Sequence, residues 1–440
     1  DYTYLGQIIF QRNGTPSQPI VISGYKNEYP RVQGLSIAFS SWLNIEKIDF
    51  YGPQIIPSNW NDMDTLVVDD PGITINPAEA WDTSPFRIEK VLKKYSTYAK
   101  FFNYGWNSNP TWESDNSKGL NILACNNLKI VSNKIHHHTY GIRLKNESRS
   151  ISISDNEIHH CLDGIIAHYD TASHSFSFGY STISGNNIYQ SFRNGIMLND
   201  GANHTTVADN IIMYSGQNHI STHNLNFQSD SAGYNTISNN AVAYGGYYSE
   251  FMHYPGPSGI SIHSSGPGCL VIGNYVAYHY SNSRNGNNLA DGNGLISDNN
   301  PHGSKFINNV CYRNRGNGMT IVKSKNNQII HNTFIESGFN DATSLTSGVS
   351  LAIINAADSL NVISNNIFYN SSRGGILARS GNLSSQTYID NNLYYFVSGA
   401  PYAGNLPNLY YSTPYLSFEN NAITANPIIT DSLGHLASGS

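Results

Sequence analysis

The sequence has few charged residues, and this shortage excludes several classes of protein. Only 12% of the 440 residues are charged, the net charge is −6, and lysine and arginine together number 24. Such a chain has no general electrostatic attraction for nucleic acid, so we expect no nucleic-acid partner. No stretch approaches the roughly 18 to 20 apolar residues of a membrane-spanning helix, so we expect no membrane span.

Cysteine is also scarce. The four cysteines show neither metal-ligand spacing nor the density of a disulfide-stapled scaffold: Cys125, Cys161, Cys269 and Cys311. We expect them to be mostly buried, small apolar side chains.

Asparagine, serine, glycine and tyrosine are abundant instead. A polar but weakly charged composition is typical of secreted proteins that face carbohydrate, so we expect an extracellular or cell-surface location. Asp1 leads directly into strand-like residues with no signal peptide before it, and we therefore expect a processed or trimmed N-terminus.

A repeat dominates the chain. In each copy an asparagine is followed two residues later by an apolar residue, and the pairs are Asn133/Ile135, Asn156/Ile158, Asn186/Ile188, Asn210/Ile212, Asn239/Ala241, Asn274/Val276, Asn308/Val310, Asn332/Phe334, Asn365/Ile367 and Asn391/Leu393. A short alternating strand precedes each asparagine, and a second strand, usually opening with glycine, follows it. The openers are Gly119, Gly141, Gly164, Gly195, His219, Gly259, Gly294, Gly318, Gly348 and Gly375.

This repeat predicts a parallel β-helix. Periods of about 20 to 50 residues indicate stacked repeats, and neither a Trp-Asp propeller signature nor a leucine-rich consensus is present. Stacked coils would bury an apolar column, while each backbone pairs with the coils above and below, about 4.8 Å away. Asparagine suits the corner because it tolerates left-handed backbone angles and because its amides can stack.

We divide the chain into two parts. Residues 1–118 are expected to hold N-terminal coils with an irregular insertion, which includes a short helix near 85–96. That helix could cap the coils, flank them, reach over a groove, or be a solvated insertion. Residues 119–440 are expected to form regular coils in one continuous domain.

The strands that open with glycine supply the candidate site. The first and third residues after the opener are apolar and point inward, so the fourth points outward. The predicted outward column is Leu123, Lys145, His168, Asn199, His223, His263, Asp298, Val322, Ala352 and Arg379. Its six polar members, Lys145 to Asp298, would span roughly 24 Å at about 4.8 Å per coil, which is the length of an oligosaccharide. An exposed sheet face must be polar in any case, and this is the simpler explanation.

Histidines are concentrated in this column, although the chain has only 16. His223 and His263 would be nearest neighbours, close enough to share a proton or to lower one another's pKa. A zinc site formed by His168, His223 and His263 is conceivable, but the Asn199 coil separates the first of them from the others.

Other histidines and the basic residues lie elsewhere. The run 136–138 and the pair 159–160 fall on a different strand, where we expect surface or corner packing. Basic residues flank the column, and they would favour an anionic sugar. They are Arg143 and Lys145 at one end, and Arg313, Arg315, Lys323 and Lys325 at the other, where a solvated basic turn is an equal alternative.

At this repeat the sequence resembles the pectate-lyase-like right-handed parallel β-helix superfamily over nearly its whole length. The segments 258–262, 291–298 and 317–319 resemble, more narrowly, secreted bacterial β-helix proteins, many of them associated with polysaccharide breakdown. The resemblance implies an all-β chain with a single right-handed parallel β-helix of roughly ten to twelve coils, and a substrate groove along the strands that open with glycine. The sequence departs from two branches: it has neither the paired-Asp and Gly-His-Gly motifs of polygalacturonase-like hydrolases nor the Asp-Pro-His signature of mannuronan epimerases.

Our leading hypothesis is a lyase that cleaves a uronate-containing polysaccharide by β-elimination. Such chemistry needs a base, groups that stabilise the resulting anion, and an acid for the leaving oxygen. We assign the base to His223 or His263, with Lys145 as the alternative. The predicted substrate-binding residues are Arg143, His168, Asn199, Tyr169 and Lys323. Asp298, with Asp291 nearby, is expected to orient a histidine or to hold Ca²⁺, and no other cofactor is expected.

Two other functions stay open. A glycoside hydrolase would need two carboxylates, for which Asp170, Asp200 and Asp298 are candidates. A non-catalytic protein would bind glycans, adhere or form filaments, because open ends of a β-helix invite self-assembly.

Overall fold

Strands supply all the regular structure that the computed structural model describes. It describes residues 4–26, 28–52, 117–167, 178–191, 193–199, 201–223, 233–246, 257–263, 268–279, 291–299, 302–338, 348–354, 360–372, 374–379, 387–395, 409–410, 421–431 and 433–437. Within these ranges there is no helix with the length and hydrophobicity needed to cross a membrane. The helix predicted near 85–96 lies outside the described residues.

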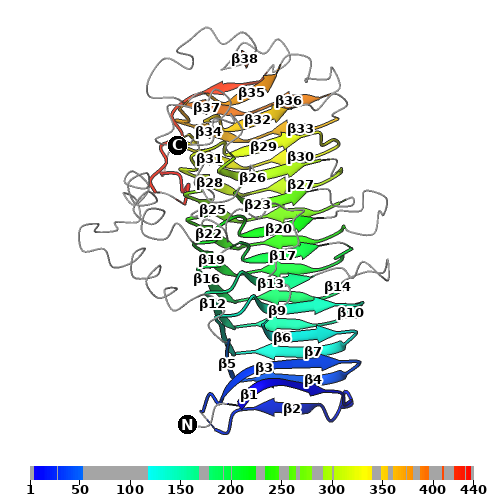
Figure 1. The fold of residues 1–440 in the computed structure, drawn as a ribbon. Coiled ribbons are helices and arrows are strands. Elements are labelled where there is room, and N and C mark those ends of the chain that lie inside the picture. The colour runs from blue at the N-terminus through cyan, green and yellow to red at the C-terminus, as the bar shows by residue number, and fades with distance from the viewer. Residues whose placement is uncertain are drawn as a thin grey trace, which may run out of the picture.

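The strands stack as three columns of parallel strands, in which each level of a column forms one rung (Figure 1). The first column lies in the middle of Figure 1 and contains β1 (Tyr4–Phe10), β3 (Arg31–Ala38), β6 (Lys118–Leu123), β9 (Tyr140–Lys145), β13 (Asp163–Ala167), β17 (Ile196–Asn199), β20 (Ile220–His223), β23 (Ser258–His263), β26 (Asn293–Asp298), β29 (Met319–Val322), β32 (Leu351–Ile354) and β35 (Ile376–Arg379). These twelve described strands agree with the predicted number of coils.

The second column lies on the right of Figure 1. It contains β2 (Ile20–Ser23), β4 (Ser41–Glu46), β7 (Asn126–Val131), β10 (Ser148–Arg149), β11 (Ser152–Ser154), β14 (Phe178–Gly179), β15 (Thr182–Ser184), β18 (Thr206–Ala208), β21 (Thr236–Ser238), β24 (Leu270–Ile272), β27 (Lys305–Ile307), β30 (Gln328–Ile330), β33 (Val362–Ser364) and β36 (Tyr388–Asp390).

The third column lies on the left of Figure 1. It contains β5 (Asp49–Tyr51), β8 (Lys134–His136), β12 (Glu157–His159), β16 (Asn187–Tyr189), β19 (Ile211–Met213), β22 (Ala241–Ala243), β25 (Tyr275–Ala277), β28 (Val310–Tyr312), β31 (Thr333–Ile335), β34 (Ile367–Tyr369), β37 (Leu393–Tyr395) and β39 (Ile423–Thr424). The strand β3 pairs with both β5 and β6, so the N-terminal coils continue directly into the later ones.

Alternation within these short strands builds the core. In the second and third columns the middle residue of a three-residue strand points inward and is buried, as Ile153 and Ile158 are. Neighbouring coils place the same kind of side chain above and below, so the apolar residues form one continuous cluster. The four cysteines are free and buried, as predicted.

The glycines that open the first-column strands are required by space. A Cβ added to Gly164 would lie 2.6 Å from the carbonyl oxygen of Gly195 in the next coil and 2.9 Å from the side chain of Ile188. His219 occupies this position in place of glycine, and its Nδ1 lies 2.8 Å from Nε2 of the buried His279.

Buried asparagines stack along the corner that precedes the third column. Each side chain donates from Nδ2 to the Oδ1 of the next asparagine, and that Oδ1 also accepts from the backbone N–H of the asparagine before it, as Asn186 does for Asn156. The stack consists of Asn133, Asn156, Asn186, Asn210, Asn240, Asn274, Asn309, Asn332, Asn366 and Asn392. Every polar group of such a side chain has a hydrogen-bond partner, so burying the amide leaves no unsatisfied donor or acceptor.

The predicted positions Asn239, Asn308, Asn365 and Asn391 were therefore wrong by one residue. Each of them precedes a member of the stack and adopts a positive φ, as do Ser132 and Asp155 in other coils. The left-handed conformation and the stacking amide belong to two successive positions, whereas the sequence analysis assigned both roles to one.

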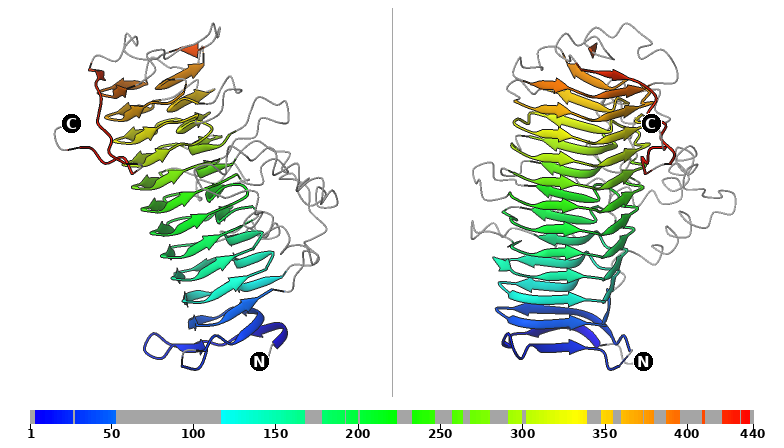
Figure 2. Two further views of the ribbon diagram at one scale, coloured as in Figure 1. Left: turned by 90° about the vertical axis from the view of Figure 1, so that its left-hand side faces the viewer. Right: turned by 180° about the vertical axis from the view of Figure 1, so that it is seen from behind.

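The C-terminal end of the first column is closed differently from its middle. The strand β38 (Leu409–Tyr410) pairs with β35 in the antiparallel direction. Residues 421–437 then run back along the third column, where Gly434 lies against the side chains of Val310 and Thr333 (Figure 2).

Candidate functional site

Four predicted site residues lie on consecutive rungs of the first column. Asn199 pairs in register with His223, His223 with His263, and His263 with Asp298. Parallel strands are about 4.8 Å apart, so these side chains form a line across four rungs. The prediction of this alignment is confirmed for the four residues.

Lys145 occupies the equivalent position nearer the N-terminus. Leu144 and Leu198, the residues before Lys145 and Asn199, both pair with Ala167, so Lys145 lies two rungs from Asn199. His168 and Tyr169 lie outside the described residues, as do the carboxylate candidates Asp170 and Asp200.

Beyond Asp298 the line becomes apolar, as predicted, but with one correction. Asp298 pairs with Val322, and Val322 pairs with Ile354 and not with Ala352. Ser350, two residues after Gly348, occupies the opener position on this rung, because Leu351 pairs with Met319. Counting from Gly348 therefore displaced the prediction by two residues.

The predicted exposure was only partly right. Asn199 and His223 are 8% and 5% exposed, so they do not face bulk solvent. The side chains of His263 and Asp298 are 25% and 23% exposed. The two members nearer the C-terminus are therefore the more exposed, and His263 and Asp298 are the members that a solvent-borne ligand reaches.

His223 and His263 form a close imidazole pair. Their ring centroids are 4.4 Å apart, and the planes are inclined by 39°. Burial lowers the pKa of His263 to about 4, and burial together with the neighbouring His263 lowers the pKa of His223 to about 3. Both rings are therefore neutral at neutral pH, the state in which imidazole accepts a proton.

Polar neighbours orient His263. Its Nε2 lies 2.9 Å from the Nδ2 of Asn299 and 3.6 Å from the Oδ2 of Asp298. Because an amide Nδ2 only donates, Nε2 accepts this hydrogen bond and the ring proton resides on Nδ1. Asn299 was not recognised from the sequence.

Two carboxyl groups near this pair hold protons more strongly than usual. Burial raises the pKa of Asp298 to about 6, partly offset by the positive charge of Lys323. Burial and the charge of Asp298 raise the pKa of Asp291 to about 7. Raised carboxyl pKa values suit a general acid near neutral pH.

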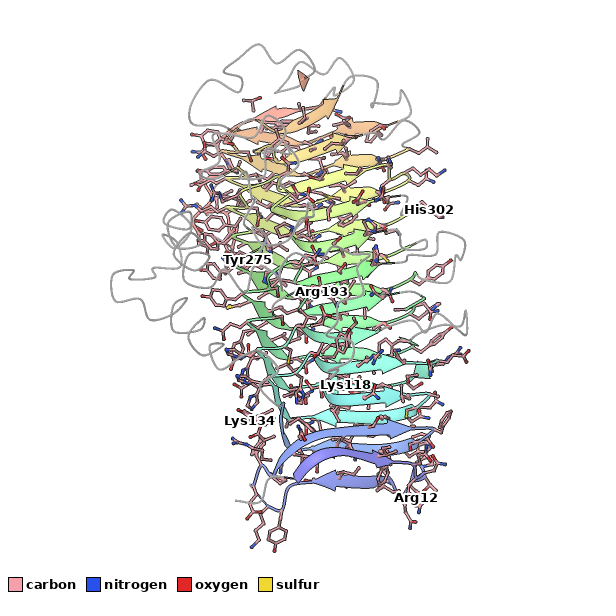
Figure 3. The ribbon with its side chains drawn as sticks, in the orientation of Figure 1. Arg12, Lys118, Lys134, Arg193, Tyr275 and His302 are labelled. Carbon is pink, nitrogen blue, oxygen red and sulfur yellow. The ribbon has the colours of Figure 1, made fainter. Side chains whose placement is uncertain are left out.

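A group of cations lies toward the N-terminal end of the same face. Burial and the charges of Arg143 and Lys145 lower the pKa of Lys118 to about 8. The guanidinium of Arg143 lies 5.3 Å from the ring centroid of Tyr140. Figure 3 shows Lys118 on the same side of the molecule as Arg193, which forms an ion pair with the buried Asp163. The outward column predicted from the sequence does not include Lys118, because that column takes the fourth residue after each opener and Lys118 precedes the opener Gly119.

The predicted second basic group is divided between faces. Lys323 is exposed beside Asp298. Arg313 follows β28 in the third column instead, where its Nε donates to Glu336 at 2.5 Å. Lys325 forms an isolated bridge with His302 at the second column.

Comparison with known proteins identifies the fold. The family model described as right handed beta helix region matches residues 118–300. The chain is a right-handed parallel β-helix. The A-module of the mannuronan C-5 epimerase AlgE6 from Azotobacter vinelandii is similar in structure, with a TM-score of 0.50, 11% identity, and coverage of 96% of this chain and 89% of that one.

Two further structures are similar to this β-helix. The GH136 lacto-N-biosidase from Eubacterium ramulus has a TM-score of 0.48 at 11% identity, and the alignment covers 89% of this chain but 60% of the biosidase. The DFA-IIIase from Arthrobacter chlorophenolicus A6 has a TM-score of 0.35 at 11% identity, with 74% and 56% covered. A search of curated protein sequences gave no significant match. At these identities the likeness shows the fold alone.

The histidines of the third column also lie close together in this β-helix. His136 and His159 end β8 and β12 and pair in register. Burial and the three nearby imidazoles lower the pKa of His159 to about 2. His138 is buried, and its Nε2 contacts the backbone oxygen of Phe50 at 3.2 Å, which agrees with the corner packing expected for it.

Proposed function

We propose that this β-helix is an extracellular enzyme that processes an anionic polysaccharide along the first column. The observation that carries the proposal is the run of Asn199, His223, His263 and Asp298 on consecutive rungs. Polar groups repeated about every 4.8 Å are suited to a polymer that lies along the column, and its reacting sugar would meet His263 and Asp298, the two members that a ligand reaches. The structurally similar AlgE6 module is named for mannuronan, a polyuronate, which supports the substrate class.

β-Elimination is the reaction that these groups suit best. The neutral imidazole of His263 removes the proton beside the sugar carboxylate, with His223 as its neighbour in the pair. In the structure its Nε2 accepts a hydrogen bond from Asn299, so the sugar displaces this amide when it binds. Asp298, protonated in part near neutral pH, donates to the leaving oxygen.

The cations act at a distance from this centre. Lys145 lies three rungs from His223, roughly 14 Å along the column. We therefore assign Lys118, Arg143 and Lys145 to carboxylates of sugars away from the cleaved bond. If Lys145 is the base instead, the polymer would be cleaved at the N-terminal end of the column, where Lys118 supplies the positive charge beside the sugar carboxylate.

Hydrolysis is the second candidate, favoured by the raised pKa values of Asp291 and Asp298. A glycosidase needs one protonated and one ionised carboxyl group, and neighbouring carboxyls with different pKa values meet that need. Binding of Ca²⁺ is the alternative role of Asp291 and Asp298: as ionised carboxylates they would hold the ion instead of acting as acid and base.

Incubation of the full chain with a panel of polyuronates and neutral glycans tests the proposal. Ultraviolet absorbance of an unsaturated product indicates elimination, whereas new reducing ends without that absorbance indicate hydrolysis. Repeating the assay with a calcium chelator, and with calcium restored, tests the cation. If neither product forms from any polymer but the chain binds a glycan, the protein is a carbohydrate-binding protein and the proposed enzyme activity is wrong.

A further inference from the structure

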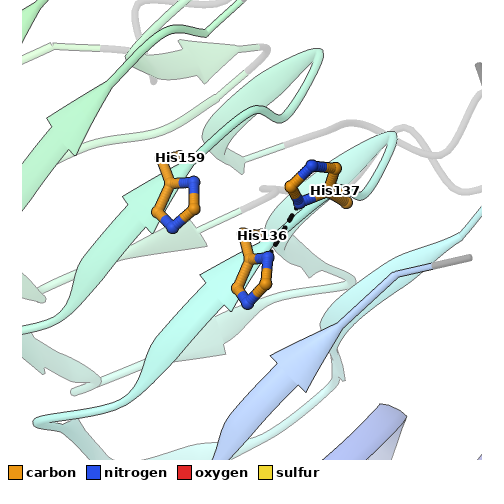
Figure 4. A group of neighbouring side chains, drawn as sticks. All are labelled: His136, His137 and His159. Atoms are coloured by element: carbon orange, nitrogen blue, oxygen red, sulfur yellow. Dashed lines mark hydrogen bonds between the residues drawn. The ribbon is translucent and has the colours of Figure 1, made fainter. Parts of the chain in front are cut away.

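Four histidines meet at one corner of the third column, away from the proposed active site. His136 and His159 end neighbouring rungs, and His137 and His160 follow them. One ring nitrogen from each of His136, His137 and His159 lies within 4.8 Å of the corresponding nitrogens of the other two (Figure 4). The rings of His136 and His159 stack with centroids 4.7 Å apart and planes inclined by 12°.

The backbone conformation explains why consecutive side chains converge. Successive residues in a strand normally point to opposite faces. His137 and His160 adopt φ values of 60° and 53°, in the left-handed region, and this breaks the alternation at the corner. Consequently the Nδ1 atoms of His136 and His137 are 2.8 Å apart, and those of His159 and His160 are 2.6 Å apart.

Packing alone does not require histidine at these positions. The rung before β8 carries Tyr51 and Gly52 there, and the rung after β12 carries Tyr189 and Gln190. Tyr189 stacks on His159 with centroids 4.8 Å apart, so tyrosine serves the stack equally well. Histidine at both positions of two adjacent rungs therefore calls for a chemical reason.

Asp49 prepares His136 for a metal ion. The Oδ1 of Asp49 lies 2.9 Å from Nε2 of His136, while the Oδ2 of this carboxylate accepts from Arg31 at 3.1 Å. A carboxylate that accepts the Nε2 proton leaves the lone pair on Nδ1, which points at His137. Metal-binding histidines usually have such a carboxylate partner on the other ring nitrogen.

We propose that His136, His137 and His159 bind one divalent transition-metal ion of the Zn²⁺ class, with His160 or water completing the coordination. Imidazole ligands favour zinc, copper and nickel over calcium and magnesium. Zinc–nitrogen distances of about 2.0 to 2.1 Å place tetrahedral ligands roughly 3.3 Å apart. Side-chain shifts of about 1 to 2 Å bring the three nitrogens from their present separations to that spacing. The ion would crosslink β8 and β12.

Titration of the full, tag-free chain with Zn²⁺ after treatment with a chelator tests the site. We expect one Zn²⁺ per chain by calorimetry, with an affinity that excess Ca²⁺ leaves unchanged, and a higher melting temperature with zinc. Cu²⁺ in place of Zn²⁺ should give an electron paramagnetic resonance spectrum with imidazole nitrogen couplings.

Variants that preserve the stack separate the metal site from packing. The double variant His136→Tyr/His159→Tyr copies the flanking rungs, and His137→Gln copies Gln190. We expect the double variant to lose the Zn²⁺ site, and His137→Gln to weaken binding at least tenfold. Asp49→Asn should weaken it about 10- to 100-fold.

A matched control lies on the second column. His204 stacks between Tyr180 and Tyr234, with ring centroids 4.7 and 5.1 Å away, so His204→Tyr keeps an aromatic stack and should bind Zn²⁺ like the unmodified chain. The proposal is overturned if the unmodified chain binds no Zn²⁺, or if a folded double variant or a folded His137→Gln variant binds it with unchanged affinity.

Discussion

The two histidine clusters of this β-helix are built on the same rungs-and-corners scaffold but differ in arrangement. In the first column the cluster takes one histidine from each of two adjacent rungs. The rings of His223 and His263 lie 4.4 Å apart, beside the carboxyl group of Asp298. In the third column each of two rungs contributes two histidines, and the ring nitrogens converge.

The difference comes from where each cluster lies on the coil. A position within a strand places one side chain per rung on a given face, so groups repeat along the axis and suit a polymer. A position at a left-handed corner places two successive side chains on the same side, so groups gather around a point and suit an ion. We therefore expect a substitution in one cluster to leave the function of the other cluster unchanged.

The largest expected effect is the loss of catalysis in His263→Ala. Removing a general base lowers the rate by about 10²- to 10⁴-fold, so product formation from the polymer that the panel identifies should fall by that factor. Zn²⁺ binding should stay unchanged, and His204→Ala should retain full activity. Unaltered activity in His263→Ala would remove this residue from the mechanism.

Breaking the shared scaffold should weaken both clusters together. Asn186→Ala removes the acceptor of the Asn156 backbone N–H and one of the acceptors of its Nδ2, which keeps its hydrogen bonds to two backbone carbonyls. A buried unsatisfied group costs about 1 to 3 kcal/mol, so we expect a loss of about 3 kcal/mol in the free energy of unfolding, measured with urea. The exposed neighbour provides the control, since Asn187→Ala should cost less than about 0.5 kcal/mol.

A smaller effect is expected at the basic end of the first column. Lys118→Met should raise KM about tenfold with little change in kcat, because a contact of about 1.5 kcal/mol to a distant sugar carboxylate is lost. Lys129 is exposed on the second column, and Lys129→Met should leave both constants unchanged. A fall in kcat without a change in KM would instead place Lys118 at the cleaved bond.

The most gradual effect, spread over several pH units, concerns stability at acidic pH in the metal-free protein. His159 has a pKa of about 2 when folded and about 6.5 when unfolded, so between these values the unfolded chain binds the extra proton. Stability therefore falls as pH falls from about 6.5, by at most about 1.4 kcal/mol per pH unit for this residue. His159→Tyr should reduce that slope in urea denaturation.

Removing the carboxyl group of Asp298 in the first column should change the pH dependence of stability in the direction opposite to His159→Tyr. Asp298 has a folded pKa of about 6, above its unfolded value, so it takes up a proton in the folded state and opposes the loss due to the histidines. Asp298→Asn should steepen the fall in stability between about pH 6 and 4. If the free energy of unfolding changes with pH equally in the unmodified chain, His159→Tyr and Asp298→Asn, then protonation of neither cluster is coupled to folding.

Much of this arrangement follows from the sequence because strand periodicity is local. The alternation around Ile153 and Ile158 gives the inward face, and counting from Gly259 and Gly294 places His263 and Asp298 on adjacent rungs. Where two asparagines are adjacent, as at Asn239 and Asn240, local pattern cannot say which one stacks. Neighbouring coils decide that register.

Other features depend on contacts between coils that have no local signal. Asn199 and His223 are buried, whereas alternation within the strand predicted that both would be exposed. The lowered pKa of Lys118 comes from burial and from the charges of Arg143 and Lys145 on the next rung. The corner histidines were noticed as a run, but their convergence depends on the left-handed φ of His137.

The reversed direction of β38 bears on polymerisation of this protein. A second copy that prolonged the first column in parallel register at its C-terminal edge would find Ala378 and Arg379 of β35 already paired with a strand of opposite polarity. Head-to-tail growth of a fibre through these two residues would first have to displace β38.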